Sequence, residues 1–273
     1  MRLRLALAAA LTVLTLGAVP AHAATAPFKL SASYDGDLYI KVLDIHIDEA
    51  AGAGDYTAAA SLRAYGVLAA FKKFDIKASA HGPMQHGEAH PGLFLYDNQD
   101  GERLRKVRVT WRPGEVTATS EPAYGNLGDP PASLAQKLAA ADPLTQIMRI
   151  TLAQSPDHVC SGDPGYFDGK QLYGVRFDPG QSVGLSKAQR ALGMTTALRC
   201  TAHYHEIAGF KAVSAKKKKK TQGLRSAVAV TFGQIGADGP WVILKVTAQT
   251  ILGPAVIELK QLQISRATAP ASQ

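Results

Sequence analysis

Apolar and polar residues alternate along most of the chain with the period of two that is typical of half-buried β-strands. The run Lys106 to Trp111 shows this clearly, because its valines fall on one face of a strand and its cations on the other. About twelve such segments follow one another, separated by Gly, Pro, Asn or Asp. Among the turns, the pair Asp35-Gly36 predicts a tight hairpin. The pattern therefore predicts a mainly β protein.

Helical spacing appears in three short places. Apolar residues recur every three or four positions from Gly66 to Phe74, and the segments Ser133–Ala141 and Pro143–Gln154 also read as helices. Asp142 is a good N-cap because Pro143 follows it at the first helical position. We predict a curved antiparallel sheet that forms a β-spiral or a partly open barrel, with two or three short helices and a helical insert at about 133–154.

The N-terminus has the form of a secretory signal peptide. Two arginines precede an apolar run from Leu5 to Val19, and Ala21-His22-Ala23 places small residues at a cleavage site. We expect cleavage after Ala23, so that residues 1–23 are the signal peptide and 24–273 form a single β-rich domain. The run is shorter than the roughly twenty residues of a membrane span. The prediction is an exported protein of the bacterial periplasm.

The two cysteines, Cys160 and Cys200, lie in the part of the chain expected to be exported. In an oxidising compartment an even pair without other partners is most simply one disulfide. The alternative is a redox-active or nucleophilic thiol, which needs a CxxC spacing or a nearby activating base. Neither accompanies Cys160, so we predict a structural disulfide.

Several short motifs together resemble a known family. They are Tyr65 to Phe74, Asp142-Pro143-Leu144-Thr145, Cys160-Ser161-Gly162, Phe167-Asp168-Gly169-Lys170 before Tyr173, Arg199-Cys200 through Ile207-Ala208-Gly209-Phe210, and Leu252-Gly253-Pro254-Ala255. In this order they resemble the periplasmic domain-of-unknown-function family DUF3108. The resemblance implies an exported β-barrel or β-spiral protein with one disulfide. Similar folds belong to envelope-integrity proteins and to lipoprotein carriers of the LolA and LolB kind, which hold acyl chains in a curved apolar sheet. The family implies no catalytic residue.

Three hypotheses about function follow from these patterns. The first is a non-enzymatic protein of cell-envelope homeostasis that binds a lipid-like ligand, such as a lipoprotein acyl chain, or an envelope partner. The second is a scaffolding protein with a filled core and no ligand, and the third is a metal-dependent enzyme. The residues expected to line a pocket or the core are Leu38, Ile40, Leu62, Phe71, Phe74, Trp111, Phe177 and Trp241.

The candidate ligands for a metal-dependent enzyme are histidines and the aspartates beside one of them. Asp44, His46 and Asp48 share one face of a predicted strand, as do His203 and His205. The other candidates, His81, His86 and His90, lie in a segment rich in Gly and Pro. No zinc spacing such as HExxH occurs, and the chain has no nucleophile elbow, Walker loop or dinucleotide fingerprint. We therefore predict no catalytic residue, no cofactor and no metal site.

The formal net charge of +8 at first points to nucleic acid. However, Arg2 and Arg4 leave with the signal peptide, and five of the lysines, Lys216, Lys217, Lys218, Lys219 and Lys220, lie in one basic loop at 211–223. The rest of the chain is nearly neutral. No aromatic residue is interleaved with these lysines, so nucleic acid is excluded as a partner. The loop is either a solubilising loop or a contact for anionic lipid headgroups on an envelope surface.

Overall fold

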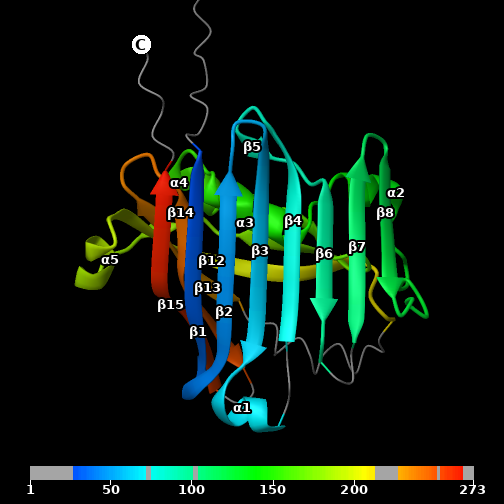
Figure 1. Ribbon diagram of the computed structural model, residues 1–273, viewed down its shortest axis with the longest axis horizontal. Helices are drawn as coiled ribbons and strands as arrows, with labels where there is room; N and C mark the ends of the chain where they lie inside the picture. The colour runs from blue at the N-terminus through cyan, green and yellow to red at the C-terminus, as the bar shows by residue number, and fades with distance from the viewer. Residues whose placement is uncertain (1–26, 72–74, 101–103, 213–226, 251–252, 267–273) are drawn as a thin grey trace, which may run out of the picture.

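The structure is a computed structural model that describes residues 27–71, 75–100, 104–212, 227–250 and 253–266. Within these ranges, fifteen strands form one antiparallel sheet (Figure 1). The strands are β1 Phe28–Leu38, β2 Ile40–Ala51, β3 Asp55–Ala64, β4 Asp75–Gln85, β5 Glu88–Ala89, β6 Leu93–Asn98, β7 Arg105–Arg112, β8 Glu115–Glu121, β9 Gly165–Phe167, β10 Leu172–Phe177, β11 Gln181–Ser182, β12 Met194–Ala208, β13 Val228–Ile235, β14 Trp241–Thr250 and β15 Gly253–Arg266. The helices are α1 Gly66–Phe71, α2 Leu134–Leu138, α3 Pro143–Thr151, α4 Pro156–Val159 and α5 Lys187–Ala191.

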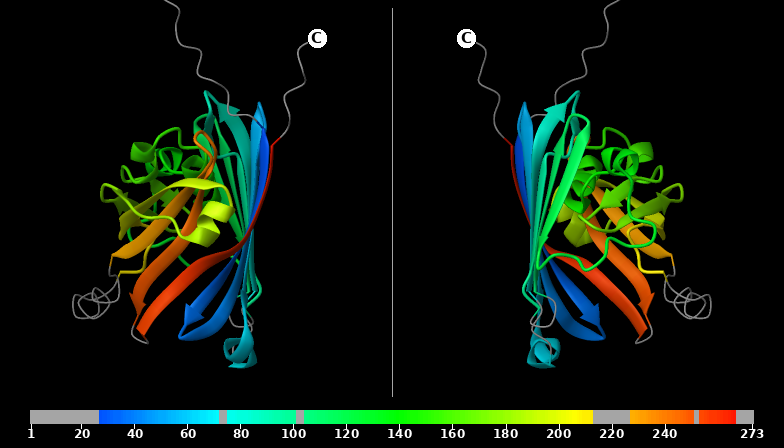
Figure 2. Two further views of the ribbon diagram at one scale, coloured as in Figure 1. Left: turned by 90° about the vertical axis from the view of Figure 1, so that its left-hand side faces the viewer. Right: turned by 90° about the vertical axis from the view of Figure 1, so that its right-hand side faces the viewer.

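The sheet is curved but not closed. Its strands follow the order β8-β7-β6-β4-β3-β2-β1-β15-β14-β13-β12-β10-β9, so β8 and β9 are its two ends. Strands β1 to β8 form a flat wall, and β13 and β14 lie opposite it on the side that carries the helices (Figure 2). The predicted fold class, a curved antiparallel sheet with a few short helices, is confirmed.

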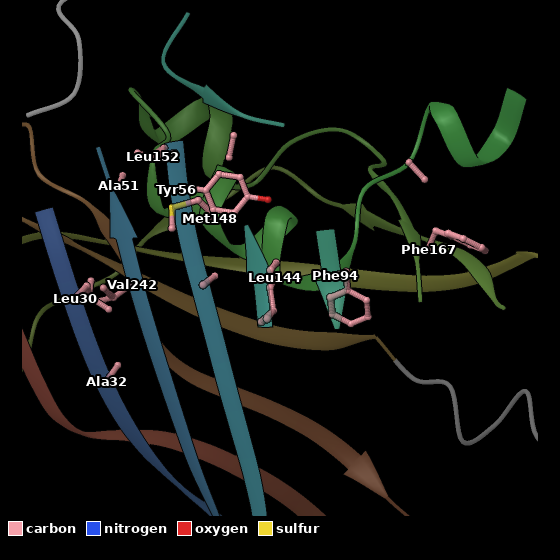
Figure 3. Packing of buried hydrophobic residues seen from close by; sticks show 14 of the residues in the cluster. Leu30, Ala32, Ala51, Tyr56, Phe94, Leu144, Met148, Leu152, Phe167 and Val242 are labelled. Atoms are coloured by element: carbon pink, nitrogen blue, oxygen red, sulfur yellow. The ribbon is translucent and has the colours of Figure 1, made fainter. Parts of the chain in front are cut away.

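Helix α3 packs on the concave side of this sheet. It contacts β3 and β4 of the flat wall and β14 of the opposite side. Its apolar stripe of Leu144, Met148 and Leu152 is buried in the main core, where Met148 lies beside Tyr56 (Figure 3). A helix with one apolar stripe gains most of its stability from such packing, which explains why nine residues suffice here.

The predicted cap of α3 is confirmed. Asp142 accepts hydrogen bonds from the backbone N–H groups of Leu144 and Thr145, at 3.0 and 2.9 Å. The hydroxyl of Thr145 also donates to Asp142 and bonds to the hydroxyl of Tyr56 on β3. Burial raises the pKa of Asp142, and the hydrogen bonds from Thr145 and Leu144 oppose that rise. The cap thus ties the start of α3 to the flat wall.

The hairpin prediction at Asp35-Gly36 is wrong. Strand β1 continues through both residues to Leu38, and the chain turns at Tyr39, whose φ is 66°. Gly36 serves a different purpose, because a Cβ at this position would lie 2.9 Å from Cβ of Leu43 on β2. The small residue is needed for close packing between strands. Helices α4 and α5 were not predicted, since four and five residues are too few to show helical periodicity.

The disulfide between Cys160, which follows α4, and Cys200 on β12 is present and closes a separation of 40 residues. The described residues hold no helix that is long and apolar enough to cross a bilayer. Residues 1–26 and 213–226 lie outside the described ranges, and with them the predicted signal peptide and Lys216 to Lys220.

Candidate functional site

The concave face carries uncovered aliphatic side chains at the end of the sheet near α1. Residues directly opposite each other on neighbouring strands share a face. Tyr34 on β1 is buried on the concave side, and the row that runs from it across β2, β3 and β4 consists of Ile45, Leu62 and Ile76. These three side chains are only half-buried. Large apolar groups left partly in water are the kind of surface that binds apolar partners.

A second row continues this surface around the bend of the sheet. Gly36 on β1 lies between Leu43 on β2 and Ile257 on β15. On the next strand, β14, Val246 lies opposite Ile257. The side chains of Leu43, Ile257 and Val246 are also half-buried. We call the residues Ile45, Leu62, Ile76, Leu43, Ile257 and Val246 the apolar face. Its members lie on β4, β3, β2, β15 and β14, with β1 between β2 and β15, and none of them is charged.

The opposite end of the concave side is filled. Helix α3 occupies it, and the void that remains between α3, β1, β2, β13 and β14 measures about 20 Å³. A pocket for a drug-sized or lipid-like ligand needs several hundred cubic ångströms. The void beneath α3 is therefore too small for a large apolar ligand.

Two larger hollows lie on the other, convex face of the flat wall. One of about 660 Å³ crosses β1, β2, β3, β4, β6 and β15, and one of about 620 Å³ crosses β4, β6, β7 and β8. Their lining side chains are mixed in character. Ser31, Asp48 and His81 border the first, and Lys77, Asp97 and Arg108 the second. Opposite charges face one another across the strands there, for example Lys77 beside Asp97, so neither hollow gathers one type of chemistry.

A buried carboxylic acid faces the inside of the molecule. Glu49 on β2 is 5% exposed, and its Oε2 accepts a hydrogen bond of 2.9 Å from the hydroxyl of Thr151 on α3. Burial raises the pKa of Glu49 to about 7, although the bond from Thr151 acts in the opposite direction. Glu49 is not among the site residues predicted from the sequence. Glu49 lies on the same face of β2 as Ile45 and Ile47. Its place among apolar residues on that face is the sequence feature that could have identified it.

The eight residues predicted to line a pocket or the core do not meet at one place. Trp241 is fully buried, while Trp111 and Phe177 pack partly buried against two different core clusters. Leu62 lies on the apolar face, and Leu38 is half-buried near the β1–β2 turn. Ile40 is wrong as a core residue, because it is 55% exposed at that turn. Phe74 lies outside the described residues, as does the side chain of Phe71.

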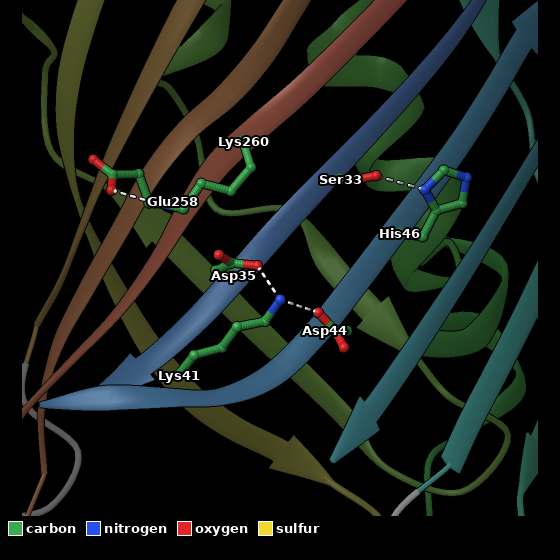
Figure 4. A network of polar contacts seen from close by, with 7 residues as sticks. All are labelled: Ser33, Asp35, Lys41, Asp44, His46, Glu258 and Lys260. Atoms are coloured by element: carbon green, nitrogen blue, oxygen red, sulfur yellow. Dashed lines mark hydrogen bonds and ion pairs between the residues drawn. The ribbon is translucent and has the colours of Figure 1, made fainter. Parts of the chain in front are cut away.

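The candidate metal ligands are also separate. Ring nitrogens of His46 lie 3.0 Å from the hydroxyl of Ser33 and 3.1 Å from Asp48, on the convex face. Lys41 bridges Asp35 and Asp44 nearby, so Asp44 is committed to an ion pair (Figure 4).

Further along the chain, Nε2 of His203 lies 2.7 Å from Asp178, and that of His205 lies 3.5 Å from Asp163. His81 is on the convex face of β4, whereas His86 lies in the β4–β5 turn and His90 follows β5. Within the described ranges, no three His, Cys, Asp or Glu side chains come together as metal ligands would.

The comparisons with known proteins leave the family open. No protein-family model matches the sequence, and no curated protein matches it. One solved structure with a similar path is a crystal structure of a beta-barrel-like protein of domain of unknown function DUF1849 from Brucella abortus. Its sequence is 11% identical to this chain. The matched region covers 88% of this chain and 98% of the Brucella abortus chain, and the TM-score is 0.46. We base the fold on the strand pairing of this chain and not on this similarity.

Proposed function

We propose that this protein is a non-enzymatic binder of acyl chains, which it holds against the apolar face. The observation that carries the proposal is the pair of aliphatic rows that stay half-exposed on the concave side. An acyl chain is the fitting ligand class, because aliphatic side chains offer dispersion contacts and no hydrogen bonds. The face is open to water, which suits reversible transfer better than permanent burial.

The experiment measures binding of a fluorescent fatty acid with an environment-sensitive dansyl group. Leu62→Asp places a charge on the apolar face and is expected to weaken binding at least tenfold, since a bound chain would then desolvate a carboxylate. Ser61→Asp is the matched control, because it adds the same charge to the same strand on the convex face. We expect it to bind like the unmodified chain.

Two results would refute the proposal. One is an unmodified chain that gives no saturable fluorescence change. The other is an equal loss of binding in Leu62→Asp and Ser61→Asp, because that would place the probe away from the concave side. Circular dichroism spectra of both variants establish that the comparison is between folded proteins.

The pentalysine fits the same proposal as a membrane-contact element. Lys216 to Lys220 lie in the sequence between β12, which ends at Ala208, and β13, which begins at Val228. Such basic residues would attract anionic headgroups by about 1 kcal/mol per cation close to the surface. Binding to vesicles with 30% phosphatidylglycerol should then fall sharply as salt rises, and alanine replacement of Lys216 to Lys220 should abolish it. Salt-independent binding would contradict this role.

A scaffolding protein without a ligand is the second candidate. The filled interior beneath α3, with a void of only about 20 Å³, favours it.

Three further proposals come from the sequence. They are export to a periplasm with loss of residues 1–23, membership of DUF3108, and a role in envelope homeostasis. N-terminal sequencing of the protein from its own cells tests the first of these directly, and an intact N-terminus would refute it.

A further inference from the structure

The small void beneath α3 has a polar character that its apolar surroundings do not explain. It is lined from three sides. The flat wall contributes Leu30, Tyr34, Ile47 and Glu49, and α3 contributes Ile147, Ile150 and Thr151. The opposite side contributes Phe232, Trp241, Val242 and Ile243. Most of these side chains are aliphatic or aromatic. Four of the lining residues, Tyr34, Glu49, Thr151 and Trp241, carry a polar side-chain atom, and the hydroxyl of Thr151 is already bonded to Glu49.

Two of the side chains that line this void each carry a buried polar atom that has no hydrogen-bond partner among the described residues. Thr151 satisfies only Oε2 of Glu49, and the second oxygen, Oε1, is buried without a hydrogen bond. The indole Nε1 of Trp241 is in the same condition, and its side chain is fully buried. One atom is an acceptor and the other is a donor. Buried polar groups are nearly always paired in native proteins, so two complementary unpaired groups beside one void point to an occupant.

A third polar group lies close to these two. Tyr34 lines the same void, and its pKa is raised by burial and by the charge of Glu49. Tyr34 can donate or accept, so it complements the acceptor of Glu49 and the donor of Trp241.

The size of the void restricts what can occupy it. A water molecule needs roughly 10–15 Å³ of such space together with two to four polar partners. About 20 Å³ and three polar groups meet both conditions for one molecule and not for a larger ligand. A carboxylate oxygen accepts, an indole N–H donates, and a water molecule offers the complementary group to each.

We propose that this void is a specific binding site for one long-lived water molecule, which accepts from Nε1 of Trp241 and donates to Oε1 of Glu49. The bound water joins β2 of the flat wall to β14 on the opposite side, in the space that α3 also lines. This site is independent of the proposed acyl-chain binding, because it lies beneath α3 and not on the apolar face.

The test uses the full chain with ¹⁵N-labelled tryptophan. The chain has two tryptophans, so two indole signals are expected, and the signal absent from Trp111→Phe identifies the other. Trp111 is the internal control, because its Nε1 donates to the carbonyl of Lys137 at 3.3 Å. We expect the indole proton of Trp241 to show a water cross-peak with the NOE-to-ROE sign ratio of a long-lived molecule, and that of Trp111 to show none.

A Trp241 indole proton without any water cross-peak, in the folded chain, would overturn the proposal. The role of Glu49 is tested separately with Glu49→Met, which keeps the length of the side chain and removes the acceptor. The cross-peak should disappear in this variant and persist in Glu115→Met, which changes an exposed glutamate at the start of β8. A cross-peak that survives Glu49→Met would overturn the assignment of Glu49, and a failure of that variant to fold leaves the test on the unmodified chain intact.

Discussion

The hydroxyl of Thr151, the last residue of α3, donates a 2.9 Å hydrogen bond to the carboxyl group of Glu49 on β2. This contact joins residues that are 102 positions apart in the sequence. The cap at Asp142 holds the first turn of α3 to β3 in a similar way. Both ends of the helix are therefore fixed to the flat wall by buried polar contacts.

The free energy of unfolding should fall as pH rises through the range set by Glu49. Its pKa is raised from 4.5 to about 7 in the folded protein, so the folded state holds the proton more tightly than the unfolded state does. Stability from this group is complete below pH 4.5 and is lost on the way to about pH 7, by on the order of 3 kcal/mol. Urea unfolding between pH 4 and 8 measures it. Glu49→Gln should flatten the profile, whereas the exposed Glu115→Gln should not, and a slope unchanged in Glu49→Gln would contradict the assignment.

Removal of the Asp142 cap should be far more costly than removal of the cap of α2. Asp142→Ala loses two backbone bonds and leaves the buried hydroxyls of Thr145 and Tyr56 poorly satisfied, so we expect a loss of about 3 kcal/mol. Ser133→Ala removes an exposed cap whose partner is the backbone of Gln136, and should cost about 1 kcal/mol. Chemical denaturation of both variants gives the comparison. Equal losses would mean that the buried network adds nothing to the cap.

Loss of the disulfide should destabilise the chain by about 4 kcal/mol, the chain-entropy value for a loop of 40 residues. Cys160→Ala with Cys200→Ala, compared with the oxidised chain in urea, measures the difference. The denaturant dependence should also steepen, because the unfolded chain without the cross-link exposes more surface. Reduction of the unmodified chain with dithiothreitol should reproduce the effect of the double variant. A stability that does not change under either treatment would show that the bond has no structural role.

Two glycines with positive φ should respond very differently to alanine. Gly209 has φ 84°, and a Cβ there would lie 2.0 Å from the carbonyl oxygen of Lys170, so Gly209→Ala forces a backbone shift and should cost about 3–4 kcal/mol. Gly87 has φ 82° with open space around it, so Gly87→Ala carries only the conformational cost of about 1 kcal/mol. Melting temperatures of the two variants test this. A similar shift in both would indicate that the loop around Gly209 adapts freely.

Much of the fold follows from local patterns in the sequence. Alternation in Lys106 to Trp111 gives β7 its buried and exposed faces, with Val107 and Val109 buried. The sequence Asp142-Pro143 predicts the start of α3 because an N-cap and an N1 proline depend only on neighbouring residues. Local signals of this kind also mislead. Asp35-Gly36 has the composition of a hairpin turn, but this segment is extended and Gly36 leaves room for Leu43 on the neighbouring strand.

The candidate site depends on which strand faces α3 covers, and no local pattern encodes that. Leu62 and Ala58 both face inward on β3, yet Ala58 is buried and Leu62 is half-exposed, because they lie toward different ends of the sheet. For this reason Leu62 and Trp241 are both predicted from the sequence as pocket or core residues, although they differ in burial. Glu49 and Trp241 are 192 positions apart, and only the pairing of β1 with β15 brings their walls together around one void.

That pairing of the first and last described strands also governs the order in which the molecule can assemble. Ten residues of β1 find their partners on β15, more than 200 positions later, in the middle of the sheet. Closing so long a loop is slow, and neither half of the sheet has a finished edge until it happens. A chain cut short before Gly253 would expose β1 and β14 as two unprotected edges, which are templates for aggregation. The sheet is therefore complete only when β15, the last described strand, has paired with β1.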